Sequence, residues 1–239
     1  MLPEGGPDDV GATGRGATGR GATGRGATGQ GAAGPRSGLP PVVDDVAEVA
    51  RALSDGAVVG IPTDTVYGLA ALAAVPGVGA ALAATKGRQA EVAVQVLVAD
   101  VAQADLLAGP DGLSPVARRL VDRLWPGGLT VVTDRRPGLV LDLGGDPTSI
   151  GLRCPAHRAV AGLCRRVGPL AATSANRHGQ PPLVTAQEVA DGFAGQVAVV
   201  LDGGLGSQGA STVVDVRGPE PLLLRDGAVP WATVVAAAR

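Results

Sequence analysis

Hydrophobic residues from position 43 onward recur at two kinds of spacing. Between Val43 and Leu53 they recur three and four positions apart, the spacing that places them on one face of an α-helix. The short apolar run from Ala57 to Ile61 instead predicts a buried strand. Helices and strands predicted in this way follow one another without strict alternation. We therefore expect an α/β fold with a twisted sheet of mixed strand directions and flanking helices.

The same criteria predict the other elements of the folded part. Further helices are expected at residues 78–85, 101–107, 114–124, 159–166, from 185 onward and at 231–238. Further strands are expected at residues 92–99, 129–133, 150–154, 170–172, 197–201, 212–216 and 222–224. Two helix starts carry local signals: Ser114 precedes a proline, and Thr185 lies three residues before Glu188, as in a capping box.

The beginning of the chain has a different composition. From Gly11 onward the pentapeptide GATGR occurs three times and is followed by GATGQ, a period that offers no apolar face to bury. A Pro/Gly-rich junction follows at residues 34–41. We therefore predict a disordered tail at residues 1–41 and one folded domain at residues 42–239. The tail's arginines could contact RNA phosphates, but a solvated tail or an over-long assigned start explains them more simply.

Composition excludes several classes of protein. The net charge of −2 and the pI of about 5.7 do not indicate a basic nucleic-acid-binding surface, and 2% aromatic content does not favour a base-stacking platform. No uncharged apolar run reaches the about 20 residues of a membrane span, and the N-terminus lacks a signal-type apolar core, so the cytoplasm is the expected location. Cys154 and Cys164 lack the spacing of a zinc site and are expected to be reduced, buried thiols.

Familiar catalytic and cofactor motifs are also missing or out of context. A GxGxxG match at residues 204–209 precedes a predicted strand rather than the helix of a dinucleotide site. The only histidines, His157 and His178, match neither a nucleophile elbow nor a zinc site. We expect no protein-bound metal, and any Mg²⁺ would be carried by a nucleotide.

Positively charged and small polar side chains follow several predicted strands and one helix. One of them is Lys86, the only lysine among 20 basic residues. Either this position needs a compact ammonium group, or Lys86 is a surface lysine that remains by chance in a chain that otherwise uses arginine. The others are Arg88, Arg153, Ser174, Asn176, Ser211 and Arg225. Each alone is best explained as a surface charge or turn cap. Together they favour an anion site at the strand ends, and we expect them to converge on one ligand.

Seven short segments follow one another along the folded part: PTDTVYGL (62–69), KGR (86–88), WPGGLT (125–130), GLRCP (151–155), TSAN (173–176), STVVD (211–215) and RDG (225–227). In this order they resemble the motifs of the YrdC-type threonylcarbamoyl-AMP synthases. The resemblance covers about residues 44–230. It implies a YrdC-like single domain with a mostly mixed or antiparallel sheet around a positively charged cleft.

The resemblance also implies a reaction. L-Threonine, bicarbonate and ATP, with Mg²⁺ bound to the ATP, would give threonylcarbamoyl-AMP and pyrophosphate. The product would pass to partner machinery that modifies adenosine 37 of tRNAs reading ANN codons. Such a nucleotidyl transfer needs positioning and charge neutralisation more than covalent chemistry by the protein.

Residue roles carried over from the family are hypotheses for this chain. Lys86 and Arg88 would be catalytic and would face the ATP phosphates or the bicarbonate. The threonine-binding residues would be Thr63, Thr65, Arg153 and Ser211. The nucleotide-binding residues would be Ser149, Ser174, Asn176 and Arg225, in addition to Lys86 and Arg88. The division of these residues between threonine and nucleotide stays open.

The chain departs from the family pattern at several prolines. Gln89 and the pair Ala93-Val94 stand where the family usually has Pro and Pro-Leu, and Gly128 stands where it has Pro. We expect a looser loop after Lys86, because φ is no longer restricted there. Two other functions remain open: an RNA-binding YrdC-like module without turnover, and a carbamoyl-transfer domain of the hydrogenase-maturation type, whose zinc-finger motifs are not found in this sequence.

Overall fold

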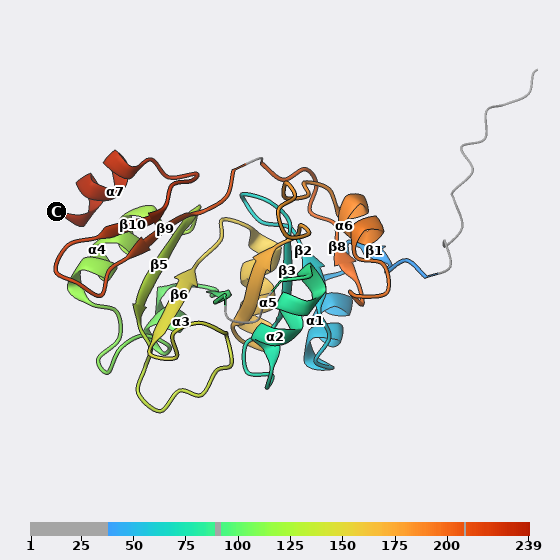
Figure 1. Cartoon of the computed structure of the whole chain (residues 1–239), viewed down its shortest axis with the longest axis horizontal. Helices are drawn as coiled ribbons and strands as arrows, with labels where there is room; N and C mark the ends of the chain where they lie inside the picture. The colour runs from blue at the N-terminus through green and yellow to red at the C-terminus, as the bar shows by residue number, and fades with distance from the viewer. Residues whose placement is uncertain (1–37, 89–91, 208) are drawn as a thin grey trace, which may run out of the picture. The chain divides into compact units, whose positions relative to one another are not determined.

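The computed structural model describes residues 38–88, 92–207 and 209–239 (Figure 1). The GATGR repeats and Gln89 lie outside these residues, so the division into tail and domain at residue 41 stays a prediction. None of the described helices is long and apolar enough to cross a membrane.

The described strands form one mixed sheet with the order β1-β8-β2-β3-β7-β4-β6-β5-β9-β10. The strands are β1 (Val42–Val43), β2 (Val59–Ile61), β3 (Gly68–Leu72), β4 (Gln95–Leu97), β5 (Leu129–Asp134), β6 (Ser149–Arg153), β7 (Leu170–Ser174), β8 (Val200–Leu201), β9 (Thr212–Asp215) and β10 (Leu222–Arg225). Parallel pairs such as β4/β6 and β5/β9 occur beside antiparallel pairs such as β3/β7 and β5/β6. Strands that are distant in sequence thus become neighbours in the middle of the sheet.

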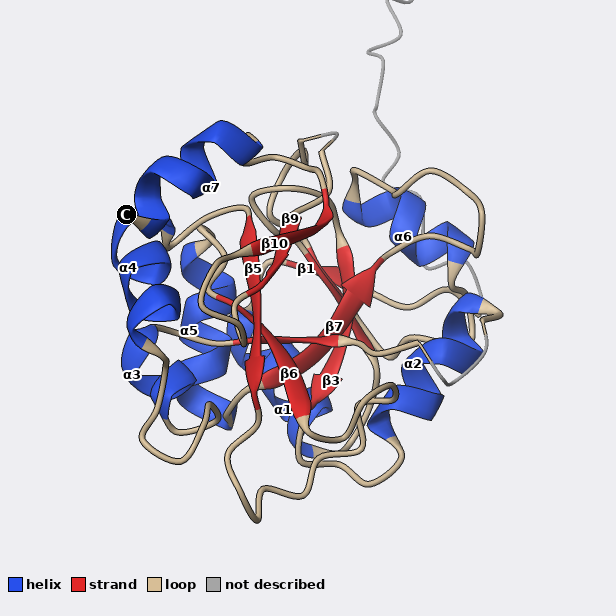
Figure 2. Cartoon of the chain, turned by 60° about the vertical axis from the view of Figure 1, so that its left-hand side comes forward, coloured by secondary structure: helices blue, strands red, loops and turns tan. Residues whose placement is uncertain are grey.

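Helices surround this sheet (Figure 2). They are α1 (Val46–Ser54), α2 (Val78–Lys86), α3 (Val101–Asp105), α4 (Pro115–Leu124), α5 (Arg158–Val167), α6 (Ala186–Gly192) and α7 (Trp231–Ala238). The two expected helix starts are confirmed: the Ser114 hydroxyl accepts from the Ala117 N–H, and Thr185 and Glu188 form the reciprocal capping box. The mixed sheet and flanking helices confirm the predicted α/β fold class.

Two hydrophobic clusters cover the two faces of the sheet at β3, a strand that was not predicted from the sequence. In β3, Leu69 and Ala71 belong to the cluster that includes α2, α4, α6 and α7, whereas Ala70 belongs to the cluster that includes α1 and α5. Successive side chains of a strand point to opposite faces, so both faces of β3 are covered. The strand was not predicted because Gly, Ala and Leu have little intrinsic preference for strands.

Candidate functional site

A pocket of about 350 Å³ lies on the sheet where β7, β4, β6, β5, β9 and β10 are successive neighbours. Nine of the ten residues predicted from the sequence line it: Thr63, Thr65, Lys86, Arg88, Ser149, Arg153, Ser174, Ser211 and Arg225. The tenth, Asn176, contacts Lys86 directly, with its Oδ1 2.8 Å from the lysine Nζ. The predicted convergence of these side chains on one place is therefore seen in the structure, while their individual roles stay hypotheses.

Strand alternation places side chains in this pocket. In β6, Ser149, Gly151 and Arg153 line the pocket. The intervening Ile150 and Leu152 belong to a hydrophobic cluster, although Ile150 also borders the pocket. The sequence Ser-Ile-Gly-Leu-Arg thus places its polar or small residues on one face and its large apolar residues on the other. The arginine at the end of β6 is carried into the pocket by the same strand that packs into the core.

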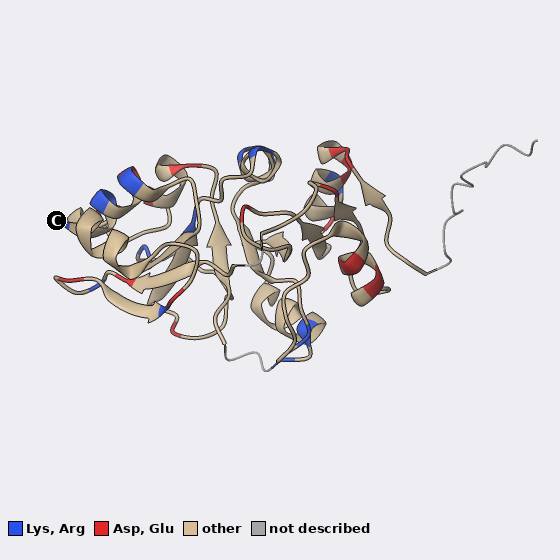
Figure 3. Cartoon of the chain, turned by 90° about the horizontal axis from the view of Figure 1, so that it is seen from above, with Lys and Arg blue, Asp and Glu red and all other residues tan. Residues whose placement is uncertain are grey.

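Positive charge predominates among the described residues that line the pocket. The cations are Lys86, Arg88, Arg135, Arg153 and Arg225, and no Asp or Glu lies among the described lining residues. Elsewhere in the described part, Arg residues are interspersed with Asp and Glu along several helices and loops (Figure 3). Five cations around one cavity of this size suit a ligand with several anionic oxygens.

Arg153 is held by three hydrogen bonds and is only 2% exposed. Its Nη2 donates to Asp64 Oδ1 at 2.8 Å, its Nη1 to Thr65 Oγ1 at 2.9 Å and its Nε to the Gly127 carbonyl at 3.0 Å. Burial lowers the pKa of the Arg153 guanidinium, and the charge of Asp64 opposes this shift. One N–H on each of Nη1 and Nη2 has no partner among the described residues, so the guanidinium can still receive an anion.

The hydroxyls of Thr63 and Thr65 extend the hydrogen bonds of Arg153 into a chain in which each member donates to the next. Thr63 Oγ1 donates its proton to the Val66 carbonyl at 2.6 Å, and it lies 2.9 Å from Thr65 Oγ1. Because a hydroxyl has only one proton, Thr65 must be the donor to Thr63. The chain runs from Arg153 to Thr65, to Thr63 and to the Val66 carbonyl. Thr63 Oγ1 also accepts from the Thr65 N–H at 3.2 Å, so Thr65 Oγ1 is the one of the two that can still accept from a ligand.

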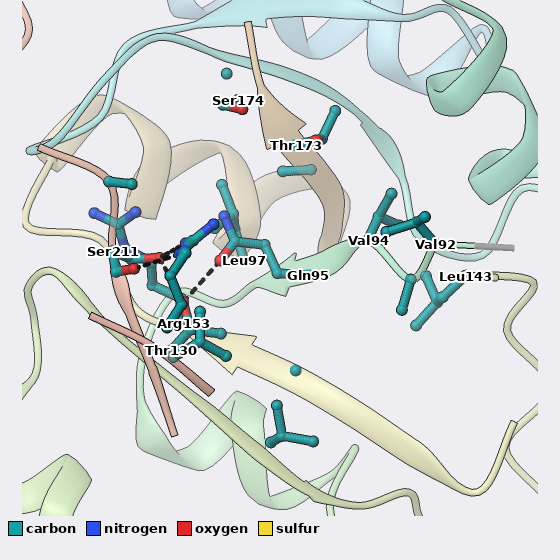
Figure 4. Close-up of a pocket in the computed structure, with 18 of the residues that line it drawn as sticks. Val92, Val94, Gln95, Leu97, Thr130, Leu143, Arg153, Thr173, Ser174 and Ser211 are labelled. Carbon is teal, nitrogen blue, oxygen red and sulfur yellow. Dashed lines mark hydrogen bonds between the residues drawn. The ribbon is translucent and has the colours of Figure 1, made fainter. Parts of the chain in front are cut away.

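A second chain of the same kind starts at Arg225 and continues through Ser211 and Thr130 to Gln95, the last three of which are labelled in Figure 4. Arg225 Nη2 donates to Ser211 Oγ at 2.9 Å, and Ser211 Oγ lies 2.9 Å from Thr130 Oγ1. Thr130 Oγ1 donates to Gln95 Oε1 at 2.8 Å, so Ser211 must donate to Thr130. Ser211 and Thr130 are both buried, and their protons are committed within the chain.

Lys86 lies at the C-terminus of α2, where Gly87 in the left-handed conformation (φ 65°) ends the helix. The ammonium donates to the Ser174 carbonyl at 2.9 Å, Ser174 Oγ at 3.0 Å and Asn176 Oδ1 at 2.8 Å. The side chain is 5% exposed. Burial, and then the positive charges of Arg88 and Arg225, lower the pKa of Lys86 to about 8. The only lysine of the chain is thus a buried pocket residue and not a surface charge.

Arg88 follows the end of α2 and also lines the pocket. Its Nη2 donates to the Val92 carbonyl at 3.0 Å, whereas its Nε is shielded from solvent and has no partner within the described residues. Shielded polar atoms are usually hydrogen-bonded, so this N–H suits an acceptor brought by a ligand. Burial lowers the pKa of the Arg88 guanidinium.

Outside this pocket, the described residues form no cluster suited to a metal ion, and the described cysteines are buried. In the part of the chain that is described, no group of three His, Cys, Asp or Glu side chains is arranged to hold a metal ion. Cys154 and Cys164 are free and buried, as predicted, and burial raises the pKa of Cys164 to about 12. His157 is half-buried, and burial lowers its pKa.

The sequence-based reasoning missed four residues of the site: Asp64, Gln95, Thr130 and Arg135. Asp64 stands between the two predicted threonines, and Thr130 ends the segment WPGGLT. Both residues belong to segments that resemble the family, but the sequence assigned neither of them a function. Arg135 follows β5 and lines the pocket, with its Nη1 donating to the Leu141 carbonyl at 2.7 Å. A cation at the end of a strand or just after it is the signal that could have identified Arg135, as it identified Arg153.

Ala93 and Val94, which stand where the family usually has Pro-Leu, lie directly before β4. The Val94 N–H donates to the Leu143 carbonyl at 2.9 Å, and an added Cβ at Gly145 would lie 2.8 Å from the Ala93 Cβ. The segment around residues 143–145 therefore packs closely against Ala93 and Val94 in the absence of proline. The expected effect of Gln89 stays a prediction, because that residue lies outside the described part.

Comparison with known proteins identifies clear relatives. The model of the Sua5/YciO/YrdC family, described as "Telomere recombination", matches residues 51–227. A Mycobacterium tuberculosis protein provisionally named threonylcarbamoyl-AMP synthase is 40% identical over 187 residues, which are 77% of this chain and 84% of the relative. The threonylcarbamoyl-AMP synthase of Bacillus subtilis is 35% identical over 77% of this chain and 54% of its own length.

Among solved structures, Sua5 of P. abyssi complexed with L-threonine is similar to this chain. The TM-score is 0.75 at 31% identity, with 80% of this chain and 56% of that chain covered. The chain thus spans about half the length of the Bacillus and P. abyssi proteins and most of the mycobacterial one.

Proposed function

The chain belongs to the Sua5/YciO/YrdC family, and from this premise we propose that it is a threonylcarbamoyl-AMP synthase. In this reaction L-threonine, bicarbonate and ATP give threonylcarbamoyl-AMP and pyrophosphate. The names of its relatives and the L-threonine bound in the P. abyssi structure support the assignment. The observation that carries it is the convergence of five cations with threonine and serine hydroxyls in one pocket.

The chemistry needs groups of this kind. The threonine nitrogen bonds to the bicarbonate carbon, while one C–O bond of bicarbonate breaks and its oxygen leaves as water with a proton from that nitrogen. An oxygen of the resulting carbamate then attacks the α-phosphorus of ATP. The bond from that phosphorus to the bridging oxygen breaks, and pyrophosphate leaves with the bonding electrons. Charge accumulates on phosphate oxygens throughout, and fixed cations in a partly buried pocket stabilise it.

The geometry suggests a division of roles among the pocket residues. The remaining N–H groups of Arg153 suit the threonine carboxylate. Thr65 and Ser211, whose protons are committed, suit the threonine ammonium or hydroxyl as acceptors. Lys86 and Arg88 suit the phosphates, with Ser149, Ser174, Asn176 and Arg225 on the nucleotide. We propose that Mg²⁺ arrives with ATP as part of the substrate.

The later fate of the product extends the proposal. Threonylcarbamoyl-AMP would pass to tRNA-modifying machinery in the cytoplasm, and bicarbonate would be the carbon source. Direct contact with RNA is a weaker alternative for this chain, because its overall charge is −2.

The deciding assay measures pyrophosphate released from ATP with and without threonine and bicarbonate. We expect release that requires both substrates. Release that does not change when threonine is omitted would contradict the proposal. Salt-sensitive RNA binding that survives removal of residues 1–40 and Lys86→Ala, without ATP turnover, would favour the RNA-binding module instead.

The lowered pKa of Lys86 predicts proton uptake when MgATP binds at pH 8. There about half of the Lys86 side chains are neutral in the free protein, because the pKa is about 8. A bound polyphosphate favours the charged form and raises this pKa, so the complex takes up protons. Calorimetric titrations in two buffers with different ionisation enthalpies measure the number of protons. Lys86→Met should abolish the uptake, and proton release by the wild type would contradict the proposed contact.

A further inference from the structure

Gln95 is the first residue of β4 and lines the pocket. Figure 4 shows it next to Thr130 and Arg153, with Val92, Val94 and Leu143 farther along the pocket. Its backbone pairs with Ala172 of β7, and β6 flanks β4 on the other side. No role was assigned to Gln95 from the sequence, and the division of roles proposed above does not use it.

Gly151 lies between Gln95 and Thr130, and even an added Cβ there would make only ordinary van der Waals contacts with both residues. Gly151 belongs to β6, the strand between β4 and β5. A Cβ at Gly151 would lie 3.6 Å from Thr130 Cγ2 and 3.9 Å from Gln95 Cβ. The hydrogen bond from Thr130 to Gln95 therefore joins two strands across the glycine.

The direction of this hydrogen-bond chain determines what Gln95 can offer a ligand. The chain starts at Arg225, whose guanidinium can only donate, and each hydroxyl passes on its single proton. Gln95 Oε1 is thereby committed as the final acceptor. Gln95 Nε2 carries two N–H groups and has no hydrogen-bond partner among the described residues. Alongside the Ser211 and Thr65 hydroxyls, which can only accept from a ligand, the Gln95 amide thus presents a neutral donor.

We propose that Gln95 is a substrate-orienting residue, which donates a hydrogen bond from Nε2 to a carboxylate oxygen of the amino-acid substrate. The inference rests on the proposed function, because it takes threonine as that substrate. Arg153, beside Gln95, supplies the charged donors for the carboxylate, and Gln95 supplies a neutral donor from the neighbouring strand. The carboxylate is then held from two strands, while the acceptors Ser211 and Thr65 remain for the ammonium and hydroxyl groups.

The test compares Gln95→Met with Gln95→Glu. Methionine keeps the bulk and removes both the donor and the acceptor, and we expect the KM for threonine to rise about tenfold with kcat within about twofold. Glutamate keeps the acceptor for Thr130 but replaces the donor with a negative charge facing a carboxylate, so its KM should rise further, about 100-fold. Gln187→Met, on the exposed surface of α6, is the matched control and should behave as the wild type.

Titration of threonine into each protein without ATP separates this inference from the proposed function. If the wild type binds threonine but releases no pyrophosphate, the proposed function fails while the affinities of the Gln95 variants still test the inference. Weaker binding by both variants, with glutamate the weaker, supports it. Wild-type behaviour of Gln95→Glu with a defect only in Gln95→Met would show that Gln95 merely holds Thr130, and would overturn it. Absence of threonine binding by the wild type would overturn it too.

Discussion

Replacing Lys86 with alanine is expected to lower kcat/KM for ATP by about 100-fold or more, which is typical for removal of a preorganised charge from a phosphate site. Lys86 is the buried cation nearest to Ser174 and Asn176, and its ammonium contacts both. Lys86→Arg should not restore activity, because a planar guanidinium does not fit the compact set of acceptors around Nζ. Steady-state pyrophosphate release at varied ATP measures both effects.

Folding of the Lys86 variants has to be checked separately from activity. The pKa of Lys86 is lowered, so folding disfavours its charged form, and removal of the ammonium should not by itself destabilise the protein. Since Lys86 binds its proton more tightly in the unfolded chain than in the folded protein, the wild type should gain stability as the pH rises from about 8 to 10.5, and Lys86→Met should lack this gain.

Activity of Lys86→Ala within a fewfold of the wild type would contradict a phosphate-binding role for Lys86.

Replacing Arg153 with alanine is expected to abolish threonine-dependent turnover and also to destabilise the fold by about 3 kcal/mol. The mostly buried Asp64 carboxylate would lose its ionic partner and retain the hydrogen bond from the Ala156 N–H. Denaturant unfolding measures the stability, and pyrophosphate release measures the turnover. Arg166→Ala, at an exposed position on α5, is the control and should change neither.

The double variant Asp64→Ala/Arg153→Ala separates the two effects of Arg153. Removing both charges removes the uncompensated carboxylate, so the double variant should be more stable than the sum of the single losses predicts. Turnover should remain lost, because the donors for the substrate carboxylate are absent. Recovery of turnover in the double variant would mean that Arg153 acts only by balancing Asp64.

Local signals made some elements predictable from sequence alone. The starts of α4 and α6 depend on Ser114 and Thr185, whose capping contacts lie within three residues. In contrast, β3 has no local signal, because its strand conformation is imposed by β2 and β7 on either side. β4 is also shorter than its apolar run predicted, and begins at Gln95 rather than at residue 92.

The site was predictable to a similar extent and for similar reasons. Cations at strand and helix ends, such as Lys86 and Arg153, could be identified because strand ends gather at one place in an α/β fold. Gln95 and Asp64 could not be assigned roles, because these depend on contacts between segments far apart in sequence, such as Asp64 with Arg153. The direction of each hydrogen-bond chain requires the coordinates of all its members.

The central claim is that one pocket on this sheet holds both threonine and ATP. A crystal structure of the protein soaked with L-threonine and a non-hydrolysable ATP analogue with Mg²⁺ tests it most directly. We predict the threonine carboxylate on Arg153 and phosphate oxygens within hydrogen-bond distance of Lys86 or Arg88, in the same cavity. Threonine and nucleotide bound at separate places, or away from these three side chains, would contradict the account.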